Sequence, residues 1–402
     1  MATRSPCTTA MRTRTPEGMD GAWAATAPVG PESLAWVPGM VSGRFFETWD
    51  FYTTCLGFRT LAESNTYVHL RHPSGAQLAV LLGPVLRTLI VLALPAVLAA
   101  RVTGFPAPAQ LVALKRWMLD HPGTITSPAF VEAVRITAMS LDEAAGSITG
   151  LPPGVATVLA QGGGFVGVQA GAAYVLGAGR PFGLFREGPI TVERVAESPV
   201  SAPAAGSAER LGRVPEGDQV RIERYDAPGR PPRYVVYVGP TETFSPIATD
   251  EPWDLTSNVY GVAGLDAGSI RATQSAMRDA GIAAGDEIQL VGFSQGGMVA
   301  SRIAASGDWN VVGLETYGAP AGDILLPDGL SGMAVRNTDD FIPALAGPQL
   351  DDHLLQVERQ AFAPGSPIPT ELAAPAHQRT AYDATATVID QATSEAVREQ
   401  IA

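Results

Sequence analysis

The sequence predicts an α/β fold with a central, mostly parallel sheet over residues 211–402, preceded by a mainly helical and irregular N-terminal region. Two observations predict it. From residue 220 onward, short apolar runs of strand length alternate with longer segments of helical spacing, a rhythm typical of a parallel sheet covered by helices. Hydrophobic residues make up 46% of the 402-residue chain and charged residues 17%, so a sizeable core can form.

The predicted strands are short runs of β-branched and aromatic residues. Residues 220–225 alternate like a half-buried strand, whereas residues 234–238 are apolar throughout, which indicates burial on both faces. The remaining elements follow the same two patterns. Strands are expected at 288–292, 311–317, 333–337 and 354–357, and helices at 268–280, 295–304 and 380–400.

The amino-acid composition divides the part of the chain that precedes the predicted sheet into several units. A stretch rich in Thr, Arg, Pro and Ala at the start has no periodicity and is predicted to be a disordered arm. A small, polar, proline-containing stretch directly before the sheet is the best candidate for a linker. The predicted units are a disordered arm (1–35), a separate module (36–82), a helical and Gly-rich apolar accessory region (84–195), a linker (196–210) and the α/β domain (211–402).

The module at residues 36–82 carries Phe51-Tyr52, then Leu56-Gly57-Phe58, and then an apolar strand pattern. This order resembles half of a vicinal-oxygen-chelate (glyoxalase-like) module. The full fold of that family pairs two such modules around a metal, and no second copy follows here. We therefore interpret residues 36–82 as a remnant without a metal site. The alternative is a metal-dependent lyase or dioxygenase function that uses His69 and His72.

The Gly-rich stretch contains a match to the dinucleotide-binding pattern Gly-x-Gly-x-x-Gly at residues 162–167, with Glu187 at the expected distance. The pattern requires a helix after the glycines, but Gly171, Gly177 and Gly179 disfavour one. We therefore expect strands and turns in this region and no cofactor.

The net charge of −13 argues against nucleic acid as a partner, because no basic surface is available to replace the counterions of the phosphates. Cys7 and Cys55 are too few for a disulfide framework. The first 30 residues show no apolar core of a secretory signal, so a cytoplasmic location is favoured. Residues 88–100 are apolar but shorter than the ~20 residues of a membrane span. A buried helix is therefore favoured there over membrane contact.

The segment Gly292-Phe293-Ser294-Gln295-Gly296 has the pattern Gly-x-Ser-x-Gly, with a predicted strand before it and a predicted helix after it. Small residues at the glycine positions let the chain turn sharply, so the serine hydroxyl is expected at the edge of the sheet. The following helix directs N–H groups toward any anion that forms there. We therefore interpret Ser294 as the nucleophile of a serine hydrolase.

A serine nucleophile needs a base and a carboxylate that orients the base. Asp340 is the preferred acid because it follows a predicted strand at its carboxyl end, and its neighbour Asp339 is the alternative. His377 is the preferred base because it lies in a loop before the last predicted helix. His353, which stands beside two aspartates, is more typical of a surface histidine.

An oxyanion formed at this serine needs two N–H donors. The first is expected from Gln295, at the start of the predicted helix. The second should come from the loop after the strand at 234–238, where Pro240 has no N–H, so Thr241 is preferred over Glu242. Four aromatic residues are candidates for an acyl pocket, with core packing as the alternative: Phe244, Trp253, Tyr260 and Tyr317.

Residues 215–402 resemble an α/β-hydrolase of the compact lipase and cutinase kind. Besides the Gly-Phe-Ser-Gln-Gly-Gly segment, the resemblance rests on Trp253-Asp254-Leu255-Thr256-Ser257-Asn258 and on a late His-x-x-x-x-Tyr, here His377 to Tyr382. Residues 316–320 and 340–343 resemble two blocks of class-3 lipases, and the second block places the acid of that family at Asp340.

The resemblance implies an esterase or lipase that cleaves small-molecule or lipid esters through Ser294, His377 and Asp340 by way of an acyl-enzyme. Thioesterase, amidase or acyltransferase chemistry would use the same groups. A non-catalytic binding protein on a hydrolase scaffold is the alternative from another class. With a histidine base, we expect activity to rise with pH as the imidazole loses its proton.

Overall fold

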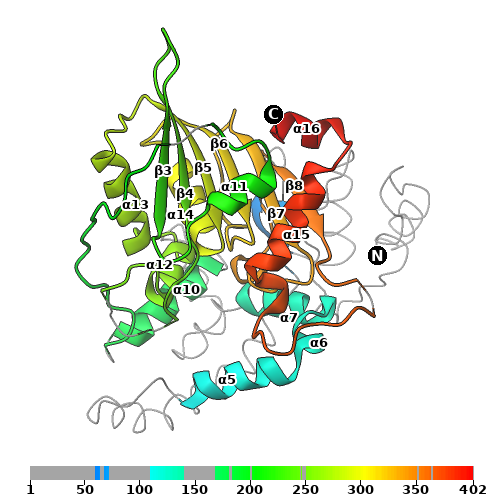
Figure 1. Ribbon diagram of the computed structural model, residues 1–402. Helices are drawn as coiled ribbons and strands as arrows, with labels where there is room; N and C mark the ends of the chain where they lie inside the picture. Colours follow the sequence, from blue (N-terminus) through cyan, green and yellow to red (C-terminus); the bar gives the residue numbers. More distant parts are fainter. Residues whose placement is uncertain are drawn as a thin grey trace, which may run out of the picture.

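The computed structural model describes residues 59–63, 68–71, 109–139, 168–180, 183–199, 202–244, 246, 250–350, 353–363 and 365–401. Within these residues, one mixed sheet of six strands in sequence order forms the centre of the molecule (Figure 1). Its strands are β3 (Val220–Tyr225), β4 (Arg233–Val238), β5 (Glu287–Phe293), β6 (Val311–Tyr317), β7 (Ser331–Asn337) and β8 (Leu355–Arg359). The edge strand β3 is antiparallel to β4, and the other neighbours are parallel. The predicted mostly parallel α/β sheet is therefore confirmed.

Helices cover both faces of this sheet. The helices α12 (Leu255–Val262), α13 (Gly268–Asp279) and α14 (Gln295–Ser306) lie on one face, with α10 (Val168–Gly179) packed on α12. The opposite face carries α11 (Ser207–Arg213), α15 (Arg379–Asp390) and α16 (Glu395–Ile401) (Figure 1). Two short 3₁₀ turns, η3 (Pro343–Ala346) and η4 (Pro375–His377), lie in the loops on either side of β8.

The register of the strands gives each face its own core. Tyr237 pairs with Val291 across β4 and β5, and both pack under α11 and α15 with Leu211. The neighbouring pair along the strands, Val236 and Leu290, points to the other face and packs under the layer formed by α12, α13 and α14. Because side chains alternate along a strand, one register buries both sets at once. This explains why apolar residues occupy both faces of β4 and of the second half of β5.

Two predicted elements need correction. The predicted helix at residues 380–400 is two helices, α15 and α16, because residues 391–394 include Thr393 and Ser394, which favour helix caps over interiors. The Gly-rich stretch forms the helix α10 where strands and turns were expected. Ala172 and Leu176 of this helix are buried in the core, and their burial offsets the low helix propensity of the glycines.

Several segments of the N-terminal half are described. Arg59–Glu63 (β1) and Val68–Arg71 (β2) form an antiparallel pair, and the rest of the predicted glyoxalase-like module lies outside the described residues. The helices α5 (Ala109–Asp120), α6 (Pro122–Ile125) and α7 (Pro128–Met139) follow, and α7 contacts η3 and α10. In the described part of the chain, no helix combines the length and apolarity needed to cross a bilayer, and residues 88–100 are not among the described residues.

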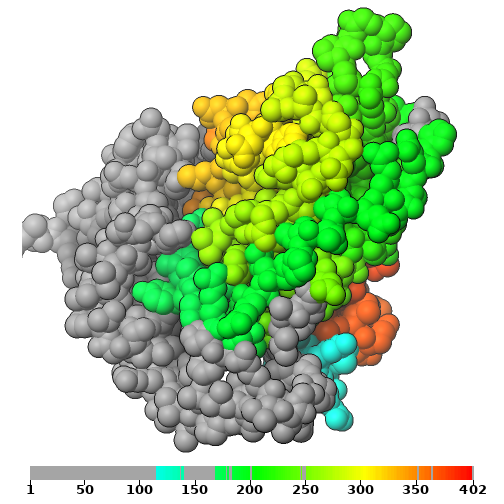
Figure 2. Space-filling model, turned by 90° about the vertical axis from the view of Figure 1, so that its left-hand side faces the viewer, coloured from blue at the N-terminus to red at the C-terminus, as the bar shows by residue number. Residues whose placement is uncertain are grey.

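An extended segment, residues 186–199, runs over the face that carries α13 (green in Figure 2). Ile190 and Val192 pack against the core of that face. Glu187 accepts a hydrogen bond from the N–H of Gly268 at 2.5 Å and pairs with Arg271 at 2.7 Å. Glu187, the acidic residue of the dinucleotide-binding pattern, thus fixes this segment to the start of α13. The glycines of that pattern, residues 162–167, lie outside the described residues.

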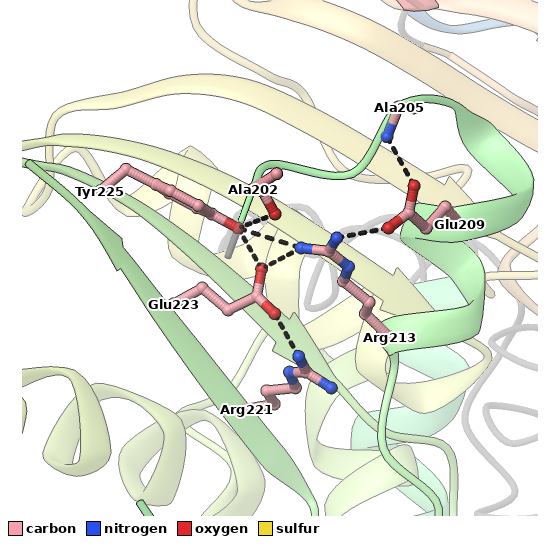
Figure 3. A network of polar contacts seen from close by, with 7 residues as sticks. All are labelled: Ala202, Ala205, Glu209, Arg213, Arg221, Glu223 and Tyr225. Carbon is pink, nitrogen blue, oxygen red and sulfur yellow. Dashed lines mark hydrogen bonds and ion pairs between the residues drawn. The ribbon is translucent and has the colours of Figure 1, made fainter. Parts of the chain in front are cut away.

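The helix α11 begins inside the segment that composition predicted as a linker, and polar contacts fix it to the sheet. Arg213 bonds Glu223 of β3 at 2.8 Å, and Tyr225 donates its hydroxyl to the same carboxylate at 2.6 Å (Figure 3). Deeper in the core, Arg210 pairs with Glu315 of β6 at 2.5 Å, and their side chains are only 8% and 2% exposed. The folded sheet domain therefore includes residues 207–213.

The pair between Arg210 and Glu315 gives a test of this anchor. Arg210→Met should lower the free energy of unfolding by about 3–5 kcal/mol, because it leaves a buried carboxylate without its cation. Arg224→Met, which breaks an exposed pair with Asp226, is the matched control and should have a much smaller effect. Urea denaturation measures both. Equal and small effects of the two variants would contradict the anchor.

Candidate active site

Ser294 lies at the sharp turn between β5 and α14, where the motif predicted it. Its backbone has φ 55° and ψ −121°, a conformation that a residue with a side chain rarely adopts. The N–H of Ser294 donates to the carbonyl oxygen of Tyr317 at the end of β6, at 2.8 Å. The turn is therefore fixed to the neighbouring strand and presents the hydroxyl at the carboxyl edge of the sheet.

The glycines on either side of this serine are required by close backbone contacts. A Cβ atom on Gly296 would overlap the carbonyl oxygen of Val238 in β4. A Cβ atom on Gly292 would overlap the backbone of Gly296 and would lie 2.5 Å from the nitrogen of Gly297. The first turn of α14 can thus lie directly against the strands only because these side chains are absent.

The structure brings Ser294, His377 and Asp340 together. Nε2 of His377 lies 2.8 Å from the Ser294 hydroxyl oxygen, and Nδ1 lies 2.6 Å from Oδ2 of Asp340. The Asp340 side chain is fully buried, the His377 side chain is 14% exposed, and Ser294 is 8% exposed. The imidazole bridges the two other groups, so it can accept the serine proton on one side while the carboxylate stabilises its positive charge on the other.

Neighbouring residues fix the imidazole in this position. The ring of Phe293 stacks on His377 with 5.4 Å between ring centres and 23° between the planes. Asn337, at the end of β7, donates its side-chain amide to the carbonyl oxygen of Ala376 at 2.9 Å, next to the histidine. Neither Phe293 nor Asn337 was predicted as a site residue from the sequence. The only sequence signal was their position beside the serine and at a strand end.

The alternative acid and base lie elsewhere. The carboxylate of Asp339 accepts the N–H groups of Ala361 at 2.8 Å and Phe362 at 2.9 Å, so it anchors the loop after β8. Nε2 of His353 lies 2.8 Å from the exposed Asp328. Neither residue contacts Ser294 through any hydrogen bond among the described residues.

The predicted oxyanion donors are the N–H groups of Gln295 and Thr241. Gln295 is the first residue of α14, and its N–H has no hydrogen-bond acceptor among the described residues. In the loop after β4, Glu242 donates its N–H to Trp253 and Gly239 donates to Gln219. Pro240 has no N–H, and the N–H of Thr241 has no acceptor in the described part of the chain. Glu242 therefore already uses its N–H in a hydrogen bond, and the role of Thr241 as the second donor stays a prediction.

The segment Trp253–Asn258, singled out in the sequence, holds this loop. The indole N–H of Trp253 donates to the carbonyl oxygen of Gly239 at 3.1 Å. The Asn258 amide donates to the Thr241 hydroxyl at 2.9 Å. The segment thus holds the backbone around Thr241, the predicted second donor.

The four aromatic candidates for an acyl pocket have other surroundings. Trp253 is buried beneath the loop, and Tyr317 is fully buried with its hydroxyl against Glu315. Tyr260 bonds Arg180, and Phe244 is 71% exposed. Core packing, the alternative interpretation, therefore describes Trp253, Tyr260 and Tyr317.

The helix α6 covers the acid–base pair from outside. Ile125 and Thr126, both buried, line a narrow hollow together with Asp340, Phe341 and His377. In the next helix, Phe130 meets the Phe341 ring edge-on at 5.6 Å. Residues more than 200 positions earlier in the chain thus restrict the access of water to the pair.

In the described residues, no three His, Cys, Asp or Glu side chains are arranged to hold a metal ion, and His72 lies outside them. Comparisons of the chain with protein-family models, with curated proteins and with solved structures each found no match. The geometry of the site is therefore the basis on which a function can be proposed.

Gly296→Ala should lower the free energy of unfolding by about 1–3 kcal/mol, because the added methyl group overlaps backbone that cannot move aside. Gly285→Ala is the matched control, since a Cβ atom there meets nothing within 4 Å. Thermal unfolding of both variants measures the effect. If Gly296→Ala is as stable as the control, the close approach of α14 to β4 is not required.

Proposed function

We propose that this chain is a serine hydrolase of the α/β-hydrolase fold that cleaves carboxylic esters through an acyl-enzyme. The observation that carries the proposal is the His377 imidazole, which lies within hydrogen-bond distance of both the Ser294 hydroxyl and the Asp340 carboxylate. The mostly parallel sheet, the Gly-x-Ser-x-Gly turn after β5 and the chain order Ser, Asp, His support the assignment to this fold.

The reaction begins when the Ser294 oxygen attacks the ester carbonyl carbon and its proton passes to Nε2 of His377. The carbonyl oxygen becomes an oxyanion, which receives hydrogen bonds from the N–H groups of Gln295 and Thr241. Asp340 stabilises the imidazolium. The imidazolium then gives its proton to the oxygen of the leaving alcohol, and the acyl group stays on the serine.

Water completes the cycle. His377 takes a proton from the water, whose oxygen attacks the acyl carbon, and the returned proton restores the Ser294 hydroxyl as the acid leaves. An alcohol, thiol or amine in place of water would make the same groups an acyltransferase. The substrates that fit are small-molecule or lipid esters, and no step requires a cofactor.

Ser294→Ala should abolish labelling by a fluorophosphonate probe and lower the hydrolysis of a p-nitrophenyl ester by several orders of magnitude, because the nucleophile is removed. Ser301→Ala is the matched control, because Ser301 lies buried in α14 and its hydroxyl, within the described part of the chain, bonds only the Gly297 carbonyl. It should keep both activities. A folded wild-type chain that the probe does not label would contradict the enzyme and favour the binding protein.

Asp340→Asn should lower kcat/KM on the order of 10³–10⁴-fold, because an amide can neither fix the imidazole tautomer nor stabilise its charge. Asp339→Asn should lower stability instead, since its carboxylate holds the N–H groups of Ala361 and Phe362. Steady-state kinetics and thermal unfolding separate the two. A larger loss of kcat/KM in Asp339→Asn would contradict the assignment of the acid.

A further inference from the structure

The phenol of Tyr382 reaches the oxygen of Asp340 that also faces the histidine. Its hydroxyl donates to Oδ2 of Asp340 at 2.8 Å, while Nδ1 of His377 lies 2.6 Å from the same atom. The other oxygen, Oδ1, accepts the N–H of Ile342 at 2.9 Å. Each carboxylate oxygen therefore has a fixed donor, and rotation of the group would break these bonds.

The direction of the tyrosine hydrogen follows from its second partner. The backbone N–H of Asn337 donates to the Tyr382 oxygen at 3.1 Å. A hydroxyl group has a single hydrogen, and the Tyr382 oxygen must act as an acceptor toward Asn337 because the backbone N–H can only donate. The hydrogen is thus directed to Asp340. Burial, and then the charge of Asp340, raises the pKa of Tyr382 well above its ordinary value, so the hydroxyl stays protonated as a donor.

The ring is held as firmly as the hydroxyl. Tyr382 is fully buried, and its ring meets Phe293 edge-on at 5.5 Å and His377 at 6.2 Å. A Cβ atom on Gly318 would lie 2.9 Å from the tyrosine oxygen, so the glycine leaves just enough room for the phenol. The donor therefore has one available position.

We propose that Tyr382 is a positioning residue that holds the Asp340 carboxylate in place for His377. The inference rests on the proposed hydrolase function and adds a residue to it. Tyr382 performs two tasks. It prevents rotation of the carboxylate, and it shares the negative charge of Oδ2, so that the imidazolium is held less tightly and returns its proton more readily.

Tyr382→Phe removes the hydroxyl and keeps the ring. The expected result is a fall in kcat of about 10-fold with KM unchanged, because one hydrogen bond to a charged group is lost. The pH midpoint of the His377 ring-proton titration should rise, since the full charge of the carboxylate then favours the protonated imidazole. The other charged groups nearby, Asp339 and Arg379, stay the same in both proteins.

Tyr225→Phe in the full chain is the matched control. It also removes a tyrosine hydroxyl that donates to a carboxylate, that of Glu223. Tyr225 pairs with Arg233 at the start of β4, so it lies at the end of the sheet opposite Ser294. Thermal unfolding of both variants reports any loss of stability, and the control should keep the wild-type kcat and the wild-type His377 titration.

A double-variant cycle separates positioning from a general structural effect. If Tyr382 acts through Asp340, Tyr382→Phe should lower the rate of fluorophosphonate labelling in wild type but not in Asp340→Asn. An equal loss in both backgrounds would overturn the inference, as would an unchanged kcat and His377 titration in Tyr382→Phe.

The His377 titration needs no activity. NMR can follow it among only five histidines, assigned with His377→Gln. A wild-type chain that neither hydrolyses esters nor reacts with the probe would overturn the proposed function. The titration in Tyr382→Phe would still show whether the hydroxyl acts on the acid–base pair.

Discussion

The close approach of α14 to β4 and β5 is the constraint on which the rest of the structure depends. The helix can begin directly at Gln295 because Gly292 and Gly296 have no side chains that would meet the strand backbone. The same turn gives Ser294 its positive φ and directs its hydroxyl toward His377. Residues without side chains let the start of a helix contact the edge of the sheet. This one packing arrangement has two results, which are the strained backbone of the serine and the free N–H groups at the start of the helix.

The sheet could be predicted from the sequence because its strands carry their own signal. β4 is a nearly continuous apolar run between Pro and Gly residues, and β5 is apolar from Leu290 to its end, because both strands are buried on both faces there. The helices that were missed lack such a signal. α11 has the small and polar composition of a linker. It is held as a helix because Arg210 reaches Glu315 on β6 and Arg213 reaches Glu223 on β3, the second contact being drawn in Figure 3. α10 tolerates its glycines because the core buries its other side chains. Tertiary contacts outweigh local propensity in both helices.

The residues of the candidate site also divide into those that the sequence predicts and those that only the structure reveals. Ser294, Asp340 and His377 could be named because each lies next to a predicted element and because the chemistry requires three such groups. The choice of Asp340 over Asp339 follows in the structure from what the two carboxylates contact, an imidazole in one case and backbone N–H groups in the other. No sequence pattern distinguishes these environments. The roles of Asn337 and Phe293 likewise arise from packing between segments that are far apart in the chain.

The acid–base pair is enclosed by parts of the chain from both ends of the described region. α15 supplies Tyr382 from one side, and the last residue of α6, Ile125, with the following Thr126 borders the pair from the other. Electrostatic interactions are stronger when water is excluded, so the attraction between Asp340 and a protonated His377 depends on both covers. The N-terminal helices are thus not a separate appendage beside the sheet. They border the environment in which a buried carboxylate can stabilise charge on the imidazole, so we expect the proposed activity to depend on α6 as well as on the sheet domain.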